Sequence, residues 1–223
     1  MNIVCVAVGK QYELEAQRLL KEYPQTILIT EETEGIEKSF EMPLINGLAT
    51  KCMFGLLLPN DLDGPIIFCD ADLQPNTPDP LQYFHVQEDT EIGYVVYQGK
   101  WNFPKRLENY QKAIEKVGKI NSGFLYFKNV NICKEICKLW HEEYTTRMRK
   151  YFDNPEDPLL TGEYDEPSLI AVMNKNNFKF EFLDPRWNVW NTSGVPKENA
   201  YFIQGHIGDY TMYQSTPTFR NEA

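Results

Sequence analysis

The chain has 223 residues, 42% of them hydrophobic and 24% charged, a composition that suits a globular protein and excludes a collagen, a long coiled coil or a chain disordered throughout. Acidic residues number 32 against 22 basic ones, so the formal net charge is −10. A surface this acidic repels phosphate backbones, and we expect no nucleic-acid partner. No apolar run approaches the roughly 20 residues of a membrane helix, so we expect no transmembrane segment.

Apolar runs alternate with helix-like segments along most of the chain. The pattern predicts strands at 2–8, 26–30, 65–69, 92–97, 120–127 and 178–183. It predicts helices at 12–23, 44–58, 130–150 and 165–174. This alternation is typical of an α/β fold, in which helices cover both faces of a mainly parallel sheet. Such sheets bind ligands beyond the carboxyl ends of their strands.

No break in composition indicates a second domain. We predict one domain over residues 1–210 and a C-terminal tail over 211–223, where no helix or strand period is present. The five cysteines are odd in number and their spacings form no disulfide framework. Free thiols suit a reducing compartment, so we expect a cytoplasmic protein.

Two carboxylates follow the strand predicted at 65–69. Asp70 and Asp72 are separated only by Ala71, and residues two apart in an extended chain point the same way. Both carboxylates can therefore reach one site, and their oxygens suit Mg²⁺ or Mn²⁺, ions that can neutralise a departing diphosphate. Aspartates are also common in solvated turns at strand ends, so the pair alone leaves a structural explanation open.

The segment Phe68-Cys69-Asp70-Ala71-Asp72 resembles the Asp-x-Asp motif of nucleotide-sugar glycosyltransferases with the GT-A fold. It is most similar to family eight, the group of glycogenin and the lipopolysaccharide galactosyltransferases. Further short motifs follow in the order of that family, from position 3 to position 208. The resemblance implies a Rossmann-like GT-A domain with a mixed, mainly parallel sheet flanked by helices, and a site in which Asp70, Ala71 and Asp72 face a metal and the nucleotide.

The resemblance also implies roles for residues before and after this motif. Ala7 and Val8, with Tyr12 shortly after them, resemble the backbone and the aromatic ring that hold uracil in the family. Lys51 resembles the basic residue that approaches the diphosphate. The Asn-x-Gly segment that borders the sugar in the family is matched by Asn121 and Gly123.

The C-terminal half supplies the remaining matches. Asp165 and Glu166 resemble the acidic helix start beside the transferred sugar and are the expected catalytic residues. His206 resembles the third metal ligand, after Asp70 and Asp72, and Gly208 resembles the glycine that follows it at the nucleotide. The spacing is His-x-Gly where the family has His-x-x-Gly, and Asp209-Tyr210 stands where the family has Lys-Pro-Trp, so one expected diphosphate-binding lysine is missing.

Each residue outside the acidic pair also has a structural explanation that the sequence leaves open. These are a helix-surface ring for Tyr12, a solvated helix lysine for Lys51, a tight strand entry for Asn121 and Gly123, a favourable helix N-terminus for Asp165 and Glu166, and a hydrogen-bonded loop histidine for His206.

The motifs together predict a metal-dependent glycosyltransferase. It would use Mn²⁺ or Mg²⁺ to move a sugar from a nucleotide-diphosphate sugar to a glycan, lipid-linked or protein acceptor; by resemblance the donor is a UDP-sugar and the configuration is retained. A sugar-1-phosphate nucleotidyltransferase shares the broad fold but normally has a Gly-rich basic loop, and Val8-Gly9-Lys10-Gln11 matches it poorly. A non-catalytic nucleotide-sugar-binding protein of the same fold is a third possibility.

Aromatic residues are frequent after position 180. They suit either an acceptor platform that stacks on sugar faces or a core, and the sequence leaves both open. They are Phe182, Trp187, Trp190, Tyr201, Tyr210 and Tyr213.

Overall fold

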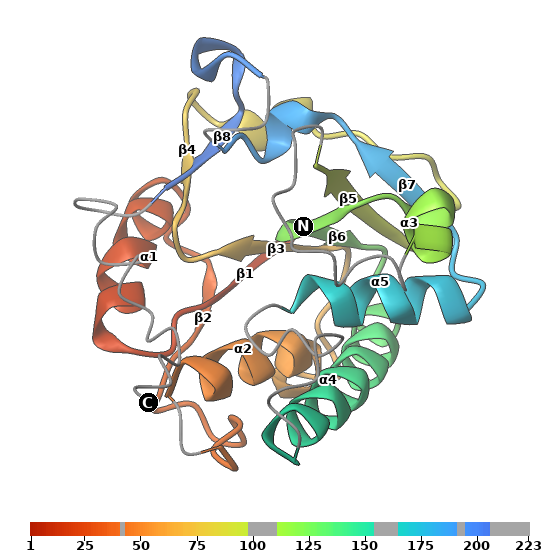
Figure 1. Cartoon of the computed structure of the whole chain (residues 1–223). Helices are drawn as coiled ribbons and strands as arrows, with labels where there is room; N and C mark the ends of the chain where they lie inside the picture. The colour runs from red at the N-terminus through yellow and green to blue at the C-terminus, as the bar shows by residue number, and fades with distance from the viewer. Residues whose placement is uncertain (41–42, 98–110, 154–164, 191–194, 206–223) are drawn as a thin grey trace, which may run out of the picture.

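A six-stranded sheet forms the centre of the computed structural model, which describes residues 1–40, 43–97, 111–153, 165–190 and 195–205 (Figure 1). The strand order is β2-β1-β3-β6-β5-β7. β1 runs parallel to β2 and β3, and β5 parallel to β7, while β6 is antiparallel to both β3 and β5. The predicted mixed, mainly parallel α/β sheet is confirmed. The strands are β1 (Asn2–Val6), β2 (Ile27–Ile29), β3 (Ile66–Asp70), β5 (Ile92–Val96), β6 (Ile120–Phe127) and β7 (Phe180–Leu183).

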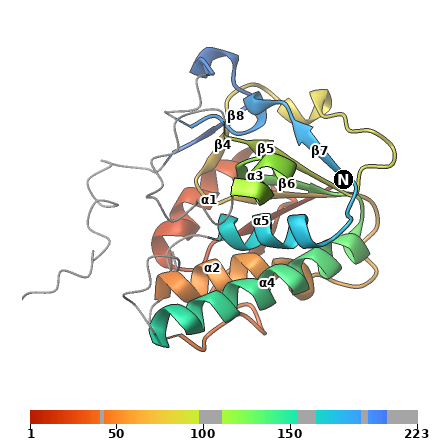
Figure 2. The same ribbon diagram turned by 45° about the vertical axis from the view of Figure 1, so that its right-hand side comes forward.

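Helices cover one face of this sheet, and a helix with a small second sheet covers the other (Figures 1 and 2). The first layer contains α2 (Pro43–Met53), α3 (Gln111–Val117), α4 (Val130–Asp153) and α5 (Glu166–Lys175). The second contains α1 (Lys10–Glu22) and the antiparallel pair of β4 (Leu73–Pro75) and β8 (Phe202–Gln204). Short 3₁₀ helices span Phe54–Leu57, Pro80–Tyr83, Pro185–Trp187 and Lys197–Asn199.

The central strand β6 shows why the sheet needs cover on both faces. All eight of its residues are buried. Leu125 and Phe127 pack into the core under α2, α4 and α5, whereas Phe124 and Tyr126 pack into the core under α1 and the small sheet. Burial of a large apolar side chain stabilises the fold by about 1.5–3 kcal/mol, so a continuous apolar run forms a stable strand only between two covering layers.

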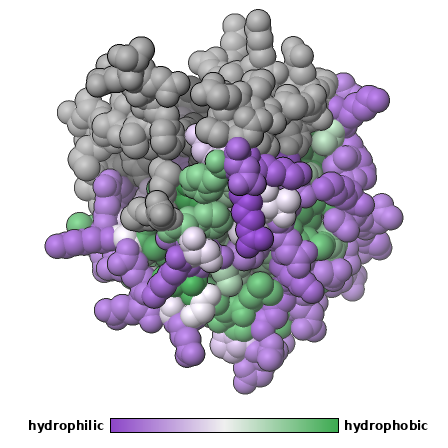
Figure 3. Space-filling model, turned by 60° about the horizontal axis from the view of Figure 1, so that its bottom comes forward, coloured by the Kyte–Doolittle hydropathy of each residue, from purple (hydrophilic) through white to green (hydrophobic). Residues whose placement is uncertain are grey.

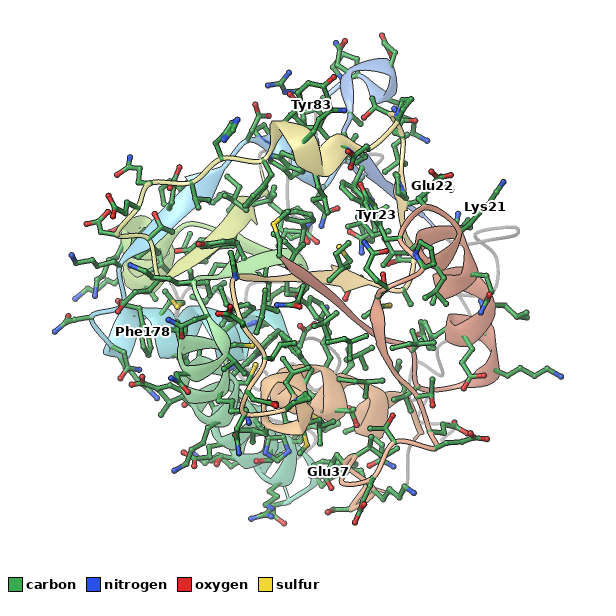
Figure 4. The ribbon with its side chains drawn as sticks, turned by 180° about the vertical axis from the view of Figure 1, so that it is seen from behind. Lys21, Glu22, Tyr23, Glu37, Tyr83 and Phe178 are labelled. Atoms are coloured by element: carbon green, nitrogen blue, oxygen red, sulfur yellow. The ribbon has the colours of Figure 1, made fainter. Side chains whose placement is uncertain are left out.

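Helix α1 follows β1 after a turn at Gly9, whose φ of +107° is disfavoured for residues with a side chain. Ala16 and Leu19 are fully buried on the inner face of this helix. At the end of the helix Lys21 points away from the protein, while Tyr23 is directed into the core (Figure 4). Helix α1 is thereby packed on the sheet with its first turn beside the carboxyl end of β1.

The structure differs from the sequence prediction at several elements. The helix predicted over 44–58 ends at Met53 and continues as a 3₁₀ turn, because Gly55 approaches α4 so closely that a Cβ there would lie 2.8 Å from the Cys133 sulfur. The short elements β4, β8 and α3 were not predicted. The strand predicted to begin at 178, β7, begins at Phe180. The other boundaries shift by only a few residues.

Hydrophilic side chains surround smaller hydrophobic patches on the face that lies at the bottom of Figure 1 (Figure 3). Within the described part of the chain, every helix is too short or too polar for a membrane span. The predicted boundary between the domain at 1–210 and the tail at 211–223 lies outside the described residues.

Candidate active site

Three strands bring the predicted site residues to one edge of the sheet. Asp70 is the last residue of β3 and lies opposite Val6 of β1, so Ala7 and Val8 leave the sheet beside the acidic motif. On the other side of β3, the antiparallel register pairs Cys69 with Phe124. Gly123, the last residue of the Asn-x-Gly segment of β6, therefore lies next to Asp70.

Lys51 is a buried cation at the centre of this edge. Its Nζ lies 2.8 Å from Oδ1 and 3.0 Å from Oδ2 of Asp70, and 3.3 Å from Oδ2 of Asp165. The same nitrogen donates a hydrogen bond of 3.0 Å to the Ser122 hydroxyl. Lys51 is only 8% exposed, so it is not a solvated helix lysine. It joins α2 to β3, β6 and the start of α5.

Asp165 occupies the N-cap position of α5, but its side chain makes no capping hydrogen bond. The carboxylate points instead to Lys51, and the residue is 3% exposed. The Trp140 indole donates a hydrogen bond of 3.0 Å to the Asp165 carbonyl, which fixes the backbone there. A simple cap does not account for this geometry. Glu166 follows at the first position of the helix, partly buried.

The carboxylates of Asp70 and Asp72 meet at one side chain. The Gln204 Nε2 amide lies 3.4 Å from Oδ2 of Asp70 and 3.3 Å from Oδ1 of Asp72. Gln204 ends β8, and the next backbone amide, of Gly205, donates a hydrogen bond of 3.0 Å to the Asp72 carbonyl. The two carboxylates therefore contact one amide group, but the extended chain expected between them is wrong, because Ala71 and Asp72 form a turn after the end of β3.

Asn121 and Gly123 form a tight junction beside the acids. The Asn121 side-chain oxygen accepts hydrogen bonds from the Gly123 amide at 2.9 Å and from Asn188 Nδ2 at 2.8 Å. A Cβ at Gly123 would lie 2.5 Å from Asn188 Nδ2 and 3.1 Å from Oδ2 of Asp70. Glycine is needed here because the neighbouring side chains approach the backbone closely, which fits the strand-entry explanation and leaves a contact with the sugar a prediction.

Burial and mutual repulsion raise the pKa values of two acidic groups of the site, Asp70 and Glu166. Burial raises the pKa of Asp70 to about 7, with Asp72 and Asp165 adding to the effect and Lys51 opposing it. Burial raises the pKa of Glu166 to about 8, and the neighbouring Asp165 charge adds to this. Burial alone would lower the pKa of Lys51, but the charges of Asp165 and Asp70 hold it well above its usual value. Among the described residues, the site therefore holds the positive charge of Lys51 beside four carboxyl groups.

The acidic side chains of the site supply some of the ligands that a hard divalent cation needs. Asp70 and Asp72 supply carboxylate oxygens from one point, and the site carries more acidic than basic groups. Within the described residues, Asp, Glu, His and Cys side chains form no group of three or more that could hold a metal ion. The predicted third ligand His206 and the neighbouring Gly208 lie outside the described residues. The acidic pair thus offers part of a coordination shell.

The predicted uracil site lies where the chain leaves β1 and enters α1. Tyr12 is partly buried on the first turn of α1 and packs against the core that contains Ala16 and Leu19. Ala7 is fully buried, and its amide donates a hydrogen bond of 2.8 Å to the Ile29 carbonyl. These positions border the carboxyl end of β1, where the resemblance expects a base, and contact with uracil stays a prediction.

Three residues of the site were missed in the sequence. Ser122 was not recognisable from strand alternation, which groups it with Phe124 and Tyr126 on the face under α1. An irregularity in the pairing of β5 with β6, between Leu125 and Asn121, turns its hydroxyl to Lys51 instead. Gln204 contacts Asp72 across 132 positions, and no local pattern indicates such a contact. Tyr97 lies near enough to the carboxylates of Glu166 and Asp165 that their charges add to burial in raising its pKa.

The aromatic residues after position 180 divide into two groups. Trp187 is 4% exposed and stacks with Phe124 at 5.3 Å between ring centres, so it belongs to the core. Phe182 and Trp190 are 54% and 37% exposed. Trp190 lines a small cavity together with Tyr97, Asn121 and Asn188. Tyr210 and Tyr213 lie outside the described residues.

Sequence comparisons identify no relative: no family model and no curated protein matches this chain. Comparison of structures shows that the chain has the GT-A fold of family-eight glycosyltransferases over nearly its whole length, which confirms the fold that the sequence predicted.

Three solved glycosyltransferase structures illustrate the likeness. A glycosyltransferase involved in glycosylation of the major capsid of PBCV-1 is 13% identical, with a TM-score of 0.58 and coverage of 95% of this chain and 96% of that one. The galactosyltransferase LgtC, in complex with donor and acceptor sugar analogues, is 13% identical, with a TM-score of 0.52 and coverage of 93% and 87%. Mouse xyloside xylosyltransferase 1 is 11% identical, with a TM-score of 0.50 and coverage of 92% and 96%. At these identities the likeness shows the fold.

Proposed function

We propose that this protein is a metal-dependent glycosyltransferase that uses a nucleotide-diphosphate sugar, with UDP as the nucleotide. The observation that carries the proposal is the meeting of Asp70, Lys51 and Asp165, from β3, α2 and α5, at the carboxyl end of a GT-A sheet. Nucleotides bind at this end of open α/β sheets. The known glycosyltransferases with this fold, LgtC among them, support the same reaction class.

The charges of the site match the charges of the reaction. Breaking the bond between the sugar and the diphosphate leaves negative charge on the departing phosphate and positive character on the anomeric carbon. Lys51, held beside Asp70, is the described cation that would approach the phosphate. Asp165 and Glu166 would lie near the anomeric carbon and orient the sugar hydroxyls. Fixed charges of this kind act strongly in a buried site because they need no reorganisation during the reaction.

Asp70 and Asp72, with His206 as the third protein ligand, are the residues that would hold Mn²⁺ or Mg²⁺. The bound ion supplies positive charge at the diphosphate and so stabilises the leaving group. Support for the third ligand comes from Gly205, whose backbone amide bonds the Asp72 carbonyl and which directly precedes His206. Imidazole nitrogen suits Mn²⁺ better than Mg²⁺, so Mn²⁺ is the preferred ion in this proposal.

The acceptor is proposed as a glycan, free or on a lipid or protein, and the transfer as retaining. Trp190 is the described aromatic residue proposed to stack on an acceptor sugar, because it is partly exposed and lies near Asn121 and Asn188 beside the acidic site. A cytoplasmic location remains the proposal for the whole protein. All five cysteines are free and buried, which suits a reducing compartment.

Product analysis tests the reaction class. We expect incubation with a panel of UDP-sugars and Mn²⁺ to release UDP, and EDTA to stop the release. A nucleotidyltransferase would instead form pyrophosphate from a nucleoside triphosphate and a sugar 1-phosphate. Pyrophosphate formation, or the absence of both UDP release and UDP binding under these conditions, would contradict the proposal.

Tyr12, on the first turn of α1, provides an independent test of nucleotide recognition. We expect Tyr12→Ala to weaken UDP binding by about 1–3 kcal/mol, the contribution of a stacked aromatic ring to base binding. Tyr12→Phe keeps the ring and is expected to bind UDP like the parent protein. Isothermal titration calorimetry with UDP and Mn²⁺ measures both. Equal UDP affinity of the alanine variant and the parent would assign Tyr12 a packing role only.

A further inference from the structure

Arg18 makes two short hydrogen bonds from α1 to the small sheet. Its Nη1 donates to the Gln74 side-chain oxygen at 2.8 Å, and its Nη2 donates to the Gly205 carbonyl at 2.7 Å. Charge-assisted hydrogen bonds of this length are stronger than neutral ones. The buried Glu15 carboxylate lies 3.9 Å from the same guanidinium and orients it. The arginine side chain is 24% exposed, so it is not an ordinary surface charge.

Both partners of Arg18 are directly connected to the acidic pair. Gln74 lies two residues after Asp72, where β4 begins to pair with β8. Gly205 donates its amide to the Asp72 carbonyl, and its neighbour Gln204 contacts the Asp70 and Asp72 carboxylates. The guanidinium therefore holds the chain on both sides of the junction at which the two carboxylates meet.

We propose that Arg18 is a positioning residue for the metal and diphosphate site. It acts through Gly205 and Gln74 and holds the end of β8 against Asp72, so that the carboxylates of Asp70 and Asp72 keep the spacing that one cation requires. This inference rests on the proposed function, because the cation belongs to it. A deviation of a fraction of an ångström in a supporting residue is enough to weaken such a site.

Because Arg18 lies on α1, it also affects the position of the predicted uracil contact. Tyr12, the predicted uracil contact, lies on the first turn of the same helix. Arg18 fixes this helix to β4, which follows Asp72, and to Gly205 at the end of β8. In this proposal it thereby sets the distance between the base and the metal ends of one nucleotide. We therefore expect loss of the guanidinium to weaken binding of Mn²⁺ and UDP together more than binding of UDP without metal.

The test compares Arg18→Met, which keeps the length of the side chain and removes its donors, with Arg149→Met. Arg149 is exposed on α4, in the layer on the other face of the sheet, and serves as the control for the same substitution. Electron paramagnetic resonance of free Mn²⁺, at saturating UDP, measures the Mn²⁺ affinity. We expect Arg18→Met to bind Mn²⁺ about tenfold more weakly, the size of one lost charge-assisted hydrogen bond, and Arg149→Met to match the parent protein.

A double-mutant cycle separates positioning from general loss of stability. Gln74→Met is expected to weaken Mn²⁺ binding less than Arg18→Met. The double variant should bind no more weakly than Arg18→Met alone, because Gln74 acts through the arginine. Melting temperatures without metal identify a purely structural effect, which would lower stability but leave the Mn²⁺ affinity of the folded variant unchanged. If Arg18→Met does not fold, Arg18→Lys replaces it in the comparison, and intermediate Mn²⁺ affinity is expected.

The two ways in which the inference fails are distinguishable. If the parent protein binds Mn²⁺ no more tightly with UDP than without it and releases no UDP from any donor, the proposed function is overturned and the inference with it. If the parent binds Mn²⁺ with UDP and the Arg18 variant binds it equally well, the inference alone is overturned. Additive losses in the Arg18 and Gln74 variants would also contradict it.

Discussion

Asp70→Asn is expected to reduce Mn²⁺-dependent turnover by a factor on the order of 10³, a loss of the size seen when one group that stabilises transition-state charge is removed. The substitution keeps the shape of the side chain and removes a carboxylate that lies at the meeting point of Lys51, Gln204 and Asp72. Asp72→Asn is expected to have a similar effect. Steady-state rates of UDP release at saturating Mn²⁺ measure both losses.

The stability of the metal-free protein provides a second readout for the same variant. The pKa of Asp70 is raised to about 7 in the folded protein, so unfolding releases a proton between about pH 4 and pH 7. The contribution of this carboxyl to the free energy of unfolding therefore decreases as the pH rises through that range. We therefore expect the free energy of unfolding of metal-free Asp70→Asn, relative to that of the parent protein, to be higher at pH 8 than at pH 5. Urea unfolding at both pH values measures this difference.

Asp63→Asn supplies the control, since Asp63 is an acid in the loop before β3. It should leave turnover unchanged. Full activity of Asp70→Asn, or undiminished UDP release by the parent protein in excess EDTA, would exclude the metal-dependent mechanism.

The sequence predicted elements that have long apolar runs and failed at short ones. The runs before Asp70 and from Ile120 to Phe127 are buried on both faces and are recognisable as strands without any tertiary information. β4 and β8 have three residues each, and they pair only because a closed fold brings Leu73 next to Gln204. Three residues carry too little periodicity for a local prediction.

The same division applies to the site. Asp70 and Asp72 are one residue apart at the end of one strand, so the sequence predicted that they lie close together. The structure brings their carboxylates to a common side chain through a turn at Ala71 and Asp72 rather than through an extended chain. The contacts of Lys51 were not predictable from spacing, because Ser122 and Asp165 come from distant elements. Resemblance assigned Lys51 to the phosphate, and the structure adds that it is held among carboxylates. Long-range side-chain contacts depend on the complete fold, which a local sequence pattern does not contain.

Lys51→Met is expected to lower the free energy of unfolding by about 3–5 kcal/mol at pH 8, the effect of removing one partner from a buried ion pair. The substitution keeps an unbranched side chain but leaves the Asp70 and Asp165 carboxylates without their shared cation. Protonation of Asp70 below pH 7 partly relieves the uncompensated charge, since its pKa is raised. The loss should therefore be smaller at pH 5, and urea unfolding at both pH values measures it.

A matched surface ion pair separates this effect from the loss of an ordinary lysine contact. Lys175 lies 2.7 Å from Glu143 but is 62% exposed in its side chain, so Lys175→Met should change the free energy of unfolding by less than about 1 kcal/mol. Adding Asp165→Asn to Lys51→Met removes one of the two uncompensated charges and should restore part of the lost stability. If Lys51→Met destabilised the protein no more than Lys175→Met, or if Asp165→Asn lowered its stability further, Lys51 would not be the charge that balances these carboxylates, and its proposed place at the diphosphate would lose its physical basis.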